Sequence, residues 1–83
     1  MPVEREEIRG RLNRVFREVF EDDEIVISDE TTARDIEEWD SLMHIVLVLA
    51  AEKEFGVQLN AAQVGKLKNV GKMIDLFMER LNK

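Results

Sequence analysis

No cysteine occurs among the 83 residues, so neither a disulfide nor a thiolate metal site is available to stabilise the chain. The sequence has one histidine, which also argues against a dedicated zinc site. The longest apolar run, residues 45–51, is far too short to span a membrane, so we expect no membrane insertion. The first ten residues carry charges where a signal peptide has its apolar segment, which predicts a cytoplasmic protein.

Basic residues are outnumbered by acidic ones. The net charge of −6 argues against nucleic acid as a partner, because nucleic-acid phosphates attract basic surfaces. Residues 1–41 hold fourteen acidic and six basic side chains, whereas residues 42–83 hold four acidic and six basic ones. We therefore expect an uneven distribution of charge over the surface, which would steer a charged partner. Most of the individual charged residues are expected only to solvate exposed helix faces.

The spacing of apolar residues predicts where the helices lie. A chain of this length forms one domain, here residues 1–83, with a small core. Near the N-terminus apolar residues recur every three or four positions, which predicts an amphipathic helix from about Val3 to Phe20. The residues of this stripe are Ile8, Leu12, Val15, Phe16, Val19 and Phe20.

The helical period is lost between residues 21 and 39. Residues 25–27 alternate like a short strand, but no second strand-like segment is present to pair with them. We therefore predict a long loop that inserts Ile25, Ile27 and Ile36 into the core. Loops of this length are uncommon in compact domains and are often functional. The carboxylates of this loop have neither the spacing nor the glycine of an EF-hand calcium site.

A second helix is predicted from Asp40 or Ser41 to about Phe55. Asp40 can cap the free amide groups at its start, and Gly56 favours a helix end. The middle of this helix, residues 45–51, is apolar all round, which predicts burial on several sides.

Two further helices are predicted in the C-terminal part of the chain. The first is short and runs from Ala61 to about Leu67, and Asn69 can cap the second. The predicted fold class is therefore all-α: a small four-helix bundle of three longer helices and one short one, with the long loop between the first two. The apolar positions of the last helix are Val70, Met73, Ile74, Phe77, Met78 and Leu81.

Ser41 is the residue that raises a question of function. It lies where the loop meets the second helix, a place where side chains are accessible, and a helix N-terminus favours an attached phosphate group. The structural alternative is that Ser41 only helps Asp40 to start the helix. A hydrolase that uses Ser41 with His44 is the least favoured interpretation, because neither a third group nor an oxyanion hole can be identified. His44 is interpreted instead as an exposed or half-exposed polar residue on an apolar helix.

The sequence around Ser41 resembles the acyl carrier proteins. That family has an Asp-Ser-Leu motif, found here at residues 40–42, followed by an apolar helix that here ends in "EKEFGVQL". The polar segment "ISDETTARDIEEWDSL" and the final "NVGKMIDLFMERL" are also similar to the corresponding parts of the family. The resemblance covers essentially the whole chain, so the sequence is identified as a member of this family.

The resemblance implies that Ser41 is esterified with 4'-phosphopantetheine, transferred from coenzyme A by a phosphopantetheinyl transferase. The thiol of this arm carries acyl groups as thioesters, and the carrier performs no catalysis itself. Its partners would be acyl-transferring or acyl-modifying enzymes, and we expect a free-standing monomer. The surface that the transferase and these enzymes recognise is expected to include Asp40, Leu42, Met43 and Val46.

Members of this family can shelter the acyl chain between their helices. An apolar helix with adaptable methionine side chains nearby would suit such a cavity. A plain packed core is the alternative for each lining residue, because small cores pack densely. The candidate lining residues are Val46, Ala50, Leu59, Leu67, Met73 and Ile74.

Several positions depart from the carriers of fatty-acid synthesis, which are more acidic after the serine and in the third-helix region. We therefore expect a specialised carrier, in fatty-acid, polyketide or modified-lipid biosynthesis, and Trp39 before the motif is similar to specialised members. The alternatives are an amino-acyl or peptidyl carrier, and a non-carrier acidic interaction module in which Ser41 is only a cap. The departing residues are Met43, His44, Ile45, Val46, Lys53, Lys66, Lys68 and Lys72.

Overall fold

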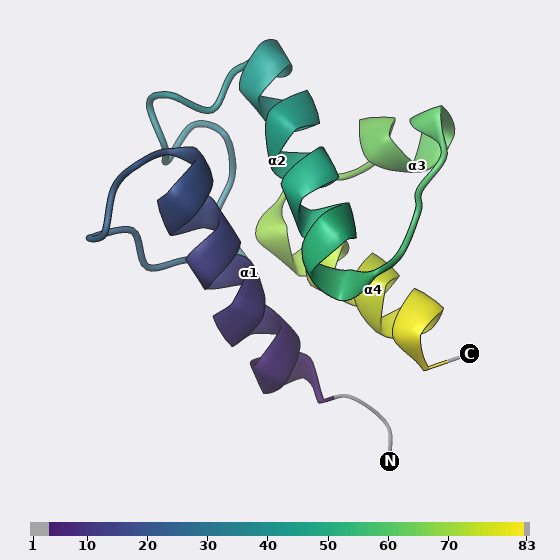
Figure 1. Cartoon of the computed structure of the whole chain (residues 1–83). Helices are drawn as coiled ribbons and strands as arrows, with labels where there is room; N and C mark the ends of the chain where they lie inside the picture. The colour runs from purple at the N-terminus through teal and green to yellow at the C-terminus, as the bar shows by residue number, and fades with distance from the viewer. Residues whose placement is uncertain (1–3, 83) are drawn as a thin grey trace.

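The computed structural model describes residues 4–82 and confirms the all-α prediction, since this range contains helices and no strand. The helices are α1 (Arg5–Val19), α2 (Ser41–Phe55), α3 (Ala61–Gly65) and α4 (Val70–Leu81). Helices α1 and α2 lie side by side with α4 behind them, and the short α3 lies on the side of α2 away from α1 (Figure 1). No helix within residues 4–82 is long and apolar enough to cross a membrane.

Helix α1 supplies one wall of the core through the stripe that its sequence predicts. It begins after Glu4 and ends before Phe20, close to the expected bounds; the predicted start at Val3 lies outside the described residues. The Phe16 ring packs between Phe20 and Trp39, with ring centroids 5.9 and 5.3 Å away. The members of the stripe that are fully or nearly buried are Ile8, Leu12, Val15, Phe16 and Phe20.

The predicted caps of α2 are confirmed. The carboxylate of Asp40 accepts a hydrogen bond from the amide of Met43 at 2.8 Å, which satisfies one of the free amides of the first turn. At the other end Gly56 adopts the left-handed conformation, with φ at 67°, which a residue without a Cβ adopts at little cost.

Burial of α2 on several sides was predicted, and this is wrong. Leu47, Val48 and Ala51 are buried, but Ile45, Val46 and Leu49 are exposed. The reason is that α1 covers only one side of the helix and α3, with five residues, is too short to cover the other. The apolar sequence of α2 therefore produces both a core face and an exposed apolar face.

Helix α3 ends slightly earlier than predicted. The amide of Leu67 donates to the carbonyl of Val64 at 3.2 Å, which forms a tight turn after Gly65 and directs Leu67 into the core. The predicted cap of α4 is confirmed, because the side chain of Asn69 accepts the amide of Lys72 at 2.8 Å.

The long loop inserts its isoleucines into the core, as predicted. Ile27 and Ile36 are buried and Ile25 is half-buried against the same cluster. Residues 25–27 have no strand to pair with, and side chains of α1 form hydrogen bonds with their backbone instead. Asn13 donates to the carbonyl of Ile25 at 3.2 Å and accepts the amide of Ile27 at 2.7 Å, and Arg17 also donates to the Ile25 carbonyl, at 2.8 Å. Helix α1 thus satisfies backbone groups of a partly buried, irregular segment.

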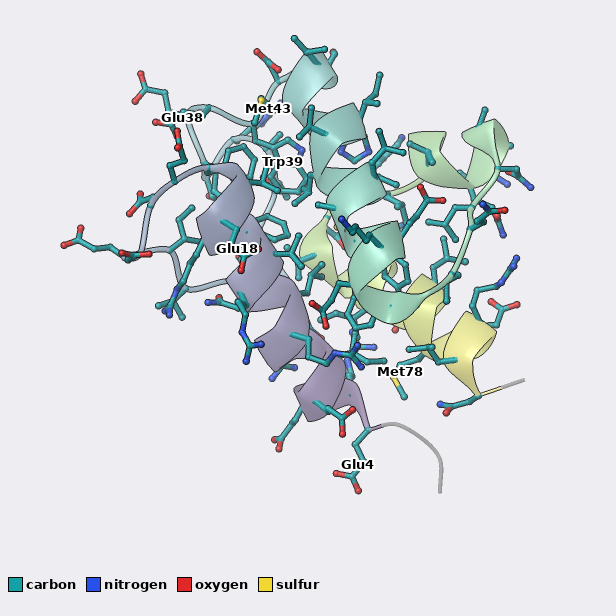
Figure 2. All side chains as sticks on the ribbon, in the orientation of Figure 1. Glu4, Glu18, Glu38, Trp39, Met43 and Met78 are labelled. Atoms are coloured by element: carbon teal, nitrogen blue, oxygen red, sulfur yellow. The ribbon has the colours of Figure 1, made fainter. Side chains whose placement is uncertain are left out.

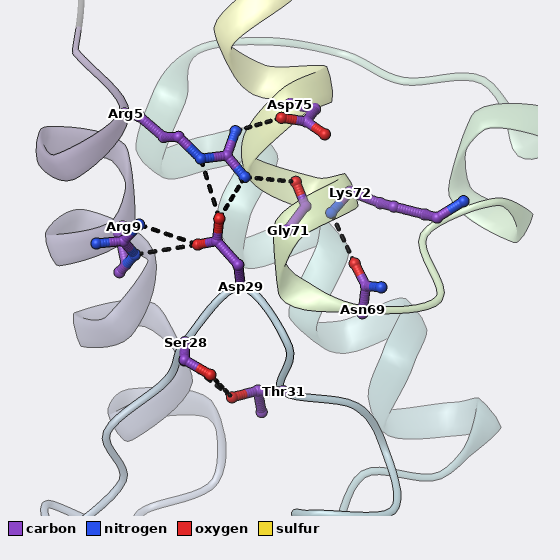
Figure 3. Close-up of polar contacts among 9 residues, drawn as sticks. All are labelled: Arg5, Arg9, Ser28, Asp29, Thr31, Asn69, Gly71, Lys72 and Asp75. Carbon is purple, nitrogen blue, oxygen red and sulfur yellow. Dashed lines mark hydrogen bonds and ion pairs between the residues drawn. The ribbon is translucent and has the colours of Figure 1, made fainter.

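The same loop caps the first turn of α4. The carbonyls of Thr31 and Asp29 accept the amides of Val70 and Gly71 at 2.9 and 2.8 Å, so the first amides of α4 are satisfied by the loop. The Asp29 carboxylate also pairs with the guanidinium groups of Arg5 and Arg9 on α1 (Figure 3).

Charge pairing holds the Asp29 carboxylate in its ionised form. The hydrogen bond from Arg5 is the main reason that the pKa of Asp29 is lowered below its ordinary value. Arg5 also pairs with Asp75 of α4, so one guanidinium links the loop to two helices. The loop is therefore tied at Asp29 to both α1 and α4.

Gly71 is required by this close approach of loop and helix. A Cβ at position 71 would lie 2.8 Å from the carbonyl oxygen of Asp29, which is backbone and cannot move aside alone. We expect Gly71→Ala to lower the free energy of unfolding by about 1–3 kcal/mol, the usual cost of overpacking.

The matched control is Gly10→Ala in α1, where a Cβ meets nothing within 4 Å. That substitution should raise stability by about 0.5–1 kcal/mol, because alanine is the better helix former. Urea unfolding of both variants measures the difference, and equal stabilities would contradict the packing argument.

Candidate functional site

Ser41 is the first residue of α2 and its side chain is exposed. Its hydroxyl makes no hydrogen bond to any group within residues 4–82. The capping of the helix is done by Asp40, as expected, so Ser41 is not needed for that purpose. A free hydroxyl at a helix N-terminus is well placed to carry an anionic substituent.

Trp39 fixes the loop immediately before Ser41. Its side chain is only 5% exposed, and its indole ring stands edge-on against Phe16, with an interplanar angle of 84°. Figure 2 shows Trp39 between the loop and the start of α2, whereas its neighbour Glu38 points outward. A large aromatic anchor two residues before Ser41 therefore holds the junction of loop and helix against the core.

His44 links three parts of the chain around this junction. The indole N–H of Trp39 donates to Nδ1 of His44 at 3.1 Å, and the two rings stack with an interplanar angle of 14°. Because indole is only a donor, Nδ1 must be unprotonated and Nε2 must carry the proton. Nε2 lies 3.2 Å from the carbonyl oxygen of Val64 in α3 and donates to it.

These contacts leave His44 unable to act as a base for Ser41. Both of its ring nitrogens are engaged with groups other than the serine hydroxyl, which removes the premise of a Ser-His nucleophile. The predicted half-exposed position of His44 is confirmed, but its hydrogen bonds were not anticipated. Within residues 4–82 there is also no group of three His, Asp or Glu side chains that could hold a metal ion.

A hollow of about 470 Å³ opens beside Ser41. Its walls come from the loop, from the start of α2 and from the segment that precedes α4. Lys68 contributes a positive charge to it, and Trp39 and Leu67 contribute apolar surface. The lining residues are Ala33, Trp39, Asp40, Ser41, His44, Leu67 and Lys68.

A second hollow, of about 330 Å³ and mainly apolar, lies between α2 and α3. Of the six predicted cavity residues, Leu59 lines this hollow and Leu67 lines the one beside Ser41. Met73 and Ile74 are fully buried in the packed core, and Ala50 is half-buried against it. The expectation that Val46 faces the interior is wrong, because it lies on the uncovered side of α2 with 41% of its surface exposed. The six candidates therefore do not form one cavity.

The exposed side of α2 forms a continuous apolar surface that starts next to Ser41. We call it the apolar face; it consists of Leu42, Ile45, Val46 and Leu49, which are 68, 54, 41 and 59% exposed. Met43, predicted with the recognition residues, is half-buried and packs against the core, so it contributes less to this surface. Apolar surface of this extent beside an accessible hydroxyl is typical of a protein interaction site.

Two features of the site were missed in the sequence. Leu42 and Val46 were expected on the recognition surface, but Ile45 and Leu49 were not, although the four residues follow the helical spacing i, i+3, i+4, i+7. The link from Trp39 to His44 has no such signal, because Trp39 lies outside the helix and helical spacing does not describe the pair.

Comparison with known proteins assigns the chain to a family. Residues 10–77 match the family described as phosphopantetheine attachment site, and the chain belongs to this family. It is also similar to the holo acyl carrier protein from Geobacter metallireducens, whose solution NMR structure superimposes with a TM-score of 0.83 at 40% sequence identity. The match covers 89% of this chain and 85% of that one. A search of curated proteins found no match.

The fold and the family together define a non-catalytic carrier protein of the acyl-carrier type, with 4'-phosphopantetheine as its covalently attached group. The residues around the start of α2 fit this group. Ser41 offers a free, exposed hydroxyl, and the hollow beside it combines the positive charge of Lys68 with apolar walls. The positive charge of Lys68 suits the phosphate of the group, whereas the Asp40 carboxylate in the same lining opposes it.

Proposed function

We propose that Ser41 is the attachment site of 4'-phosphopantetheine and that the protein presents acyl groups, as thioesters on this arm, to partner enzymes. The observation that supports the proposal is the position of the Ser41 hydroxyl. It is exposed, unbonded within the described residues, placed at a helix N-terminus and adjacent to a hollow that contains Lys68. The other serine, Ser28, lies in the long loop, where its hydroxyl is 3.3 Å from that of Thr31.

The attachment step is a phosphoryl transfer to the serine oxygen. The Oγ of Ser41 forms a bond to the phosphorus that carries the pantetheine in coenzyme A, and the P–O bond to the second phosphate breaks. Adenosine 3',5'-bisphosphate leaves, and the hydroxyl proton passes to a base of the transferase, since no histidine nitrogen of this chain is free to accept it. When bound, the group supplies the thiol that carries the acyl chain.

The chain's own contribution is to position the serine. Asp40 and Trp39 fix the backbone on its N-terminal side, and the unpaired amides of the first helical turn favour negative charge at Ser41. Lys68, across the hollow, reduces the repulsion between a phosphate and the nearby carboxylates of the loop.

Loading of the purified protein tests the proposal. Incubation with coenzyme A and a phosphopantetheinyl transferase of broad specificity should add the mass of one phosphopantetheine group, as measured by intact-protein mass spectrometry. Fragmentation should place the added mass on Ser41. An unmodified protein, or a modification on Ser28, would overturn the assignment.

We further propose that partner enzymes recognise the apolar face together with Asp40. The apolar face starts directly after Ser41, so an enzyme that reaches the arm must pass close to it. A partner that docks through basic residues finds no acidic side chain within residues 41–51 to pair with. The complementary surface on the partner is therefore apolar, and burial of exposed leucine and isoleucine side chains would supply the binding energy.

Val46→Glu tests the docking surface without touching the attachment site. A carboxylate in the apolar face should raise the KM of a cognate acyl-handling enzyme about tenfold, which corresponds to about 1.4 kcal/mol. Phosphopantetheine loading should stay largely unchanged. The matched control is Val26→Glu, because Val26 is 79% exposed but lies in the long loop. Equal turnover of the wild type and both variants would contradict recognition through this face.

The pathway we propose is a specialised one, in fatty-acid, polyketide or modified-lipid biosynthesis. Support comes from the apolar and basic residues that replace acidic ones in this chain after Ser41 and around α3. We place the carrier in the cytoplasm, where coenzyme A and its transferases are available. The intact mass of the protein isolated from its own cells would identify the acyl group and so the pathway.

A further inference from the structure

Three exposed lysines lie in the segment from the end of α3 to the start of α4. Lys66 follows the last residue of α3, Lys68 lies in the connection, and Lys72 belongs to the first turn of α4. Within residues 4–82 none of the three forms an ion pair with a carboxylate. We call them the lysine cluster. Their charge is therefore available to a partner.

The carboxylate that is best placed to neutralise Lys72 is engaged elsewhere. Asp75 lies three residues further along α4, a spacing at which opposite charges pair on a helix. It pairs instead with Arg5 of α1, and Figure 3 shows the Lys72 side chain extending away from both residues. Glu79 lines the same hollow as Lys66 and Lys72 but forms no ion pair with either in the described part of the chain. The link between α1 and α4 thus leaves the lysine cluster without its neighbouring carboxylate.

The lysine cluster adjoins both Ser41 and the apolar face. Lys68 lines the hollow beside Ser41, and Lys66 and Lys72 line a hollow of about 250 Å³ between α3 and α4. Leu67 lines both hollows, so the two adjoin at this residue. Helix α3 in turn shares the hollow of about 330 Å³ with members of the apolar face. Positive charge therefore borders the exposed apolar surface on the α3 side.

The rest of the chain has the opposite charge. Residues 41–51 and 61–74 contain three lysines and no acidic residue, which gives a charge of +3. The remaining residues hold all eighteen acidic side chains and nine basic ones, a charge of −9, and the two values add up to the net charge of −6. A partner with an acidic docking surface is therefore attracted at this face and repelled elsewhere, which orients it over Ser41.

We propose that the lysine cluster and the apolar face form one docking surface for a partner enzyme that presents an apolar patch flanked by carboxylates. This inference rests on the proposed attachment at Ser41, because it assigns the surface chemistry of the enzymes that reach the arm. An anionic membrane fits this surface less well. A lipid layer would hold its phosphates against Asp40, which lines the same hollow as Lys68, whereas an enzyme can place carboxylates opposite the lysines alone.

Two designed helical peptides probe this chemistry. They share a stripe of leucines, which one peptide flanks with glutamates and the other with lysines. Each is titrated into the isotope-labelled protein, and the amide chemical shifts give the dissociation constant and the residues in contact. We expect the glutamate-flanked peptide to shift the amides of residues 42–49 and 64–72. The lysine-flanked peptide should instead shift residues 21–24, which are all acidic.

The salt dependence of binding tests the sign of the interaction. The net charge of −6 repels the glutamate-flanked peptide, so added NaCl should strengthen binding if the net charge governs it. Attraction by the lysine cluster predicts the opposite, a several-fold weaker binding on going from low to physiological ionic strength. Binding that salt strengthens, or no binding of the glutamate-flanked peptide at all, would overturn the proposal.

A pair of double variants separates the place of the charge from its amount. Lys66→Glu with Lys72→Glu should raise the dissociation constant of the glutamate-flanked peptide about tenfold, since exposed ion pairs are individually weak but two are reversed together. The matched control is Lys53→Glu with Arg80→Glu, because both residues are exposed and line a hollow at the far end of α2 from Ser41. Each pair lowers the net charge by four, from −6 to −10. The control should change the dissociation constant by about twofold or less. Equal affinities of the two variants would overturn the proposal.

Vesicles distinguish an enzyme from a membrane as the partner. Co-sedimentation of the wild type with phosphatidylglycerol vesicles that is lost in Lys66→Glu with Lys72→Glu, together with no binding of the glutamate-flanked peptide, would overturn the protein partner in favour of a membrane. Far-ultraviolet circular dichroism checks that the variants fold. If a variant does not fold, the salt dependence of the wild type remains decisive.

The peptide titration and the loading of Ser41 fail independently, because peptide binding does not require the arm. A protein that binds the glutamate-flanked peptide as expected but gains no mass with coenzyme A and transferase would overturn the attachment and support the docking surface. A protein that is loaded on Ser41 but shows none of the expected peptide effects would overturn the docking surface alone.

Discussion

Ser41→Ala is expected to abolish phosphopantetheine loading completely, with no mass gain after prolonged incubation with coenzyme A and transferase. The reason is that the serine oxygen is the atom that forms the new bond to phosphorus, and no neighbouring hydroxyl can replace it within the same turn. The free energy of unfolding should change by about 1 kcal/mol at most, because Asp40, not Ser41, caps the helix. An all-or-none loss of loading with a nearly unchanged stability is the signature of an attachment site.

The chain provides its own control for this experiment, because Ser28 is its other serine. Ser28→Ala removes a hydroxyl from the loop, and loading should then be as complete as in the wild type. Far-ultraviolet circular dichroism of both variants checks that the helices are intact. Residual loading of Ser41→Ala would show that a different residue accepts the arm.

Trp39→Ala is expected to produce the largest loss of stability, about 3–5 kcal/mol, as for other buried large aromatic residues. Its side chain is 5% exposed, and it contacts the rings of Phe16, Phe20 and His44. A domain of this size is stable by only about 5–10 kcal/mol, so a substantial fraction of its stability depends on this one side chain.

Trp39→Ala should also increase the mobility of the loop just before Ser41, in addition to the loss of packing in the core. Amide hydrogen exchange should therefore accelerate most for residues 36–44. Urea unfolding gives the change in free energy. Val26→Ala is the control, because Val26 is 79% exposed in the same loop and its truncation should change stability by about 0.5 kcal/mol or less. If the two variants are equally stable, the anchoring role of Trp39 is wrong.

Helices and caps were predictable because their determinants are local. The stripe on α1, the cap at Asp40, the left-handed end at Gly56 and the cap at Asn69 are each set by residues within a few positions of one another. The sequence motif around Ser41 likewise predicted the class of protein to which the family comparison assigns the chain.

The environment of α2 was not predictable in the same way. A helix that is apolar all round is compatible with complete burial, and only the length of α3 and the placement of α1 decide which side stays uncovered. Val46 shows the consequence, since the same apolar side chain suits a cavity wall or a docking surface until its neighbours are known.

The sequence by itself determined an all-helical domain with a serine at the start of its second helix, because local spacing and capping are properties of neighbouring residues. Its carrier class followed from the resemblance of its motifs to a known family. The tertiary structure alone decided what surrounds that serine. It brought Trp39 from the loop, His44 from α2 and Val64 from α3 into one chain of contacts, and it placed one hollow beside Ser41 and another between α2 and α3. Such contacts depend on how separate elements pack, which no local pattern in the sequence specifies.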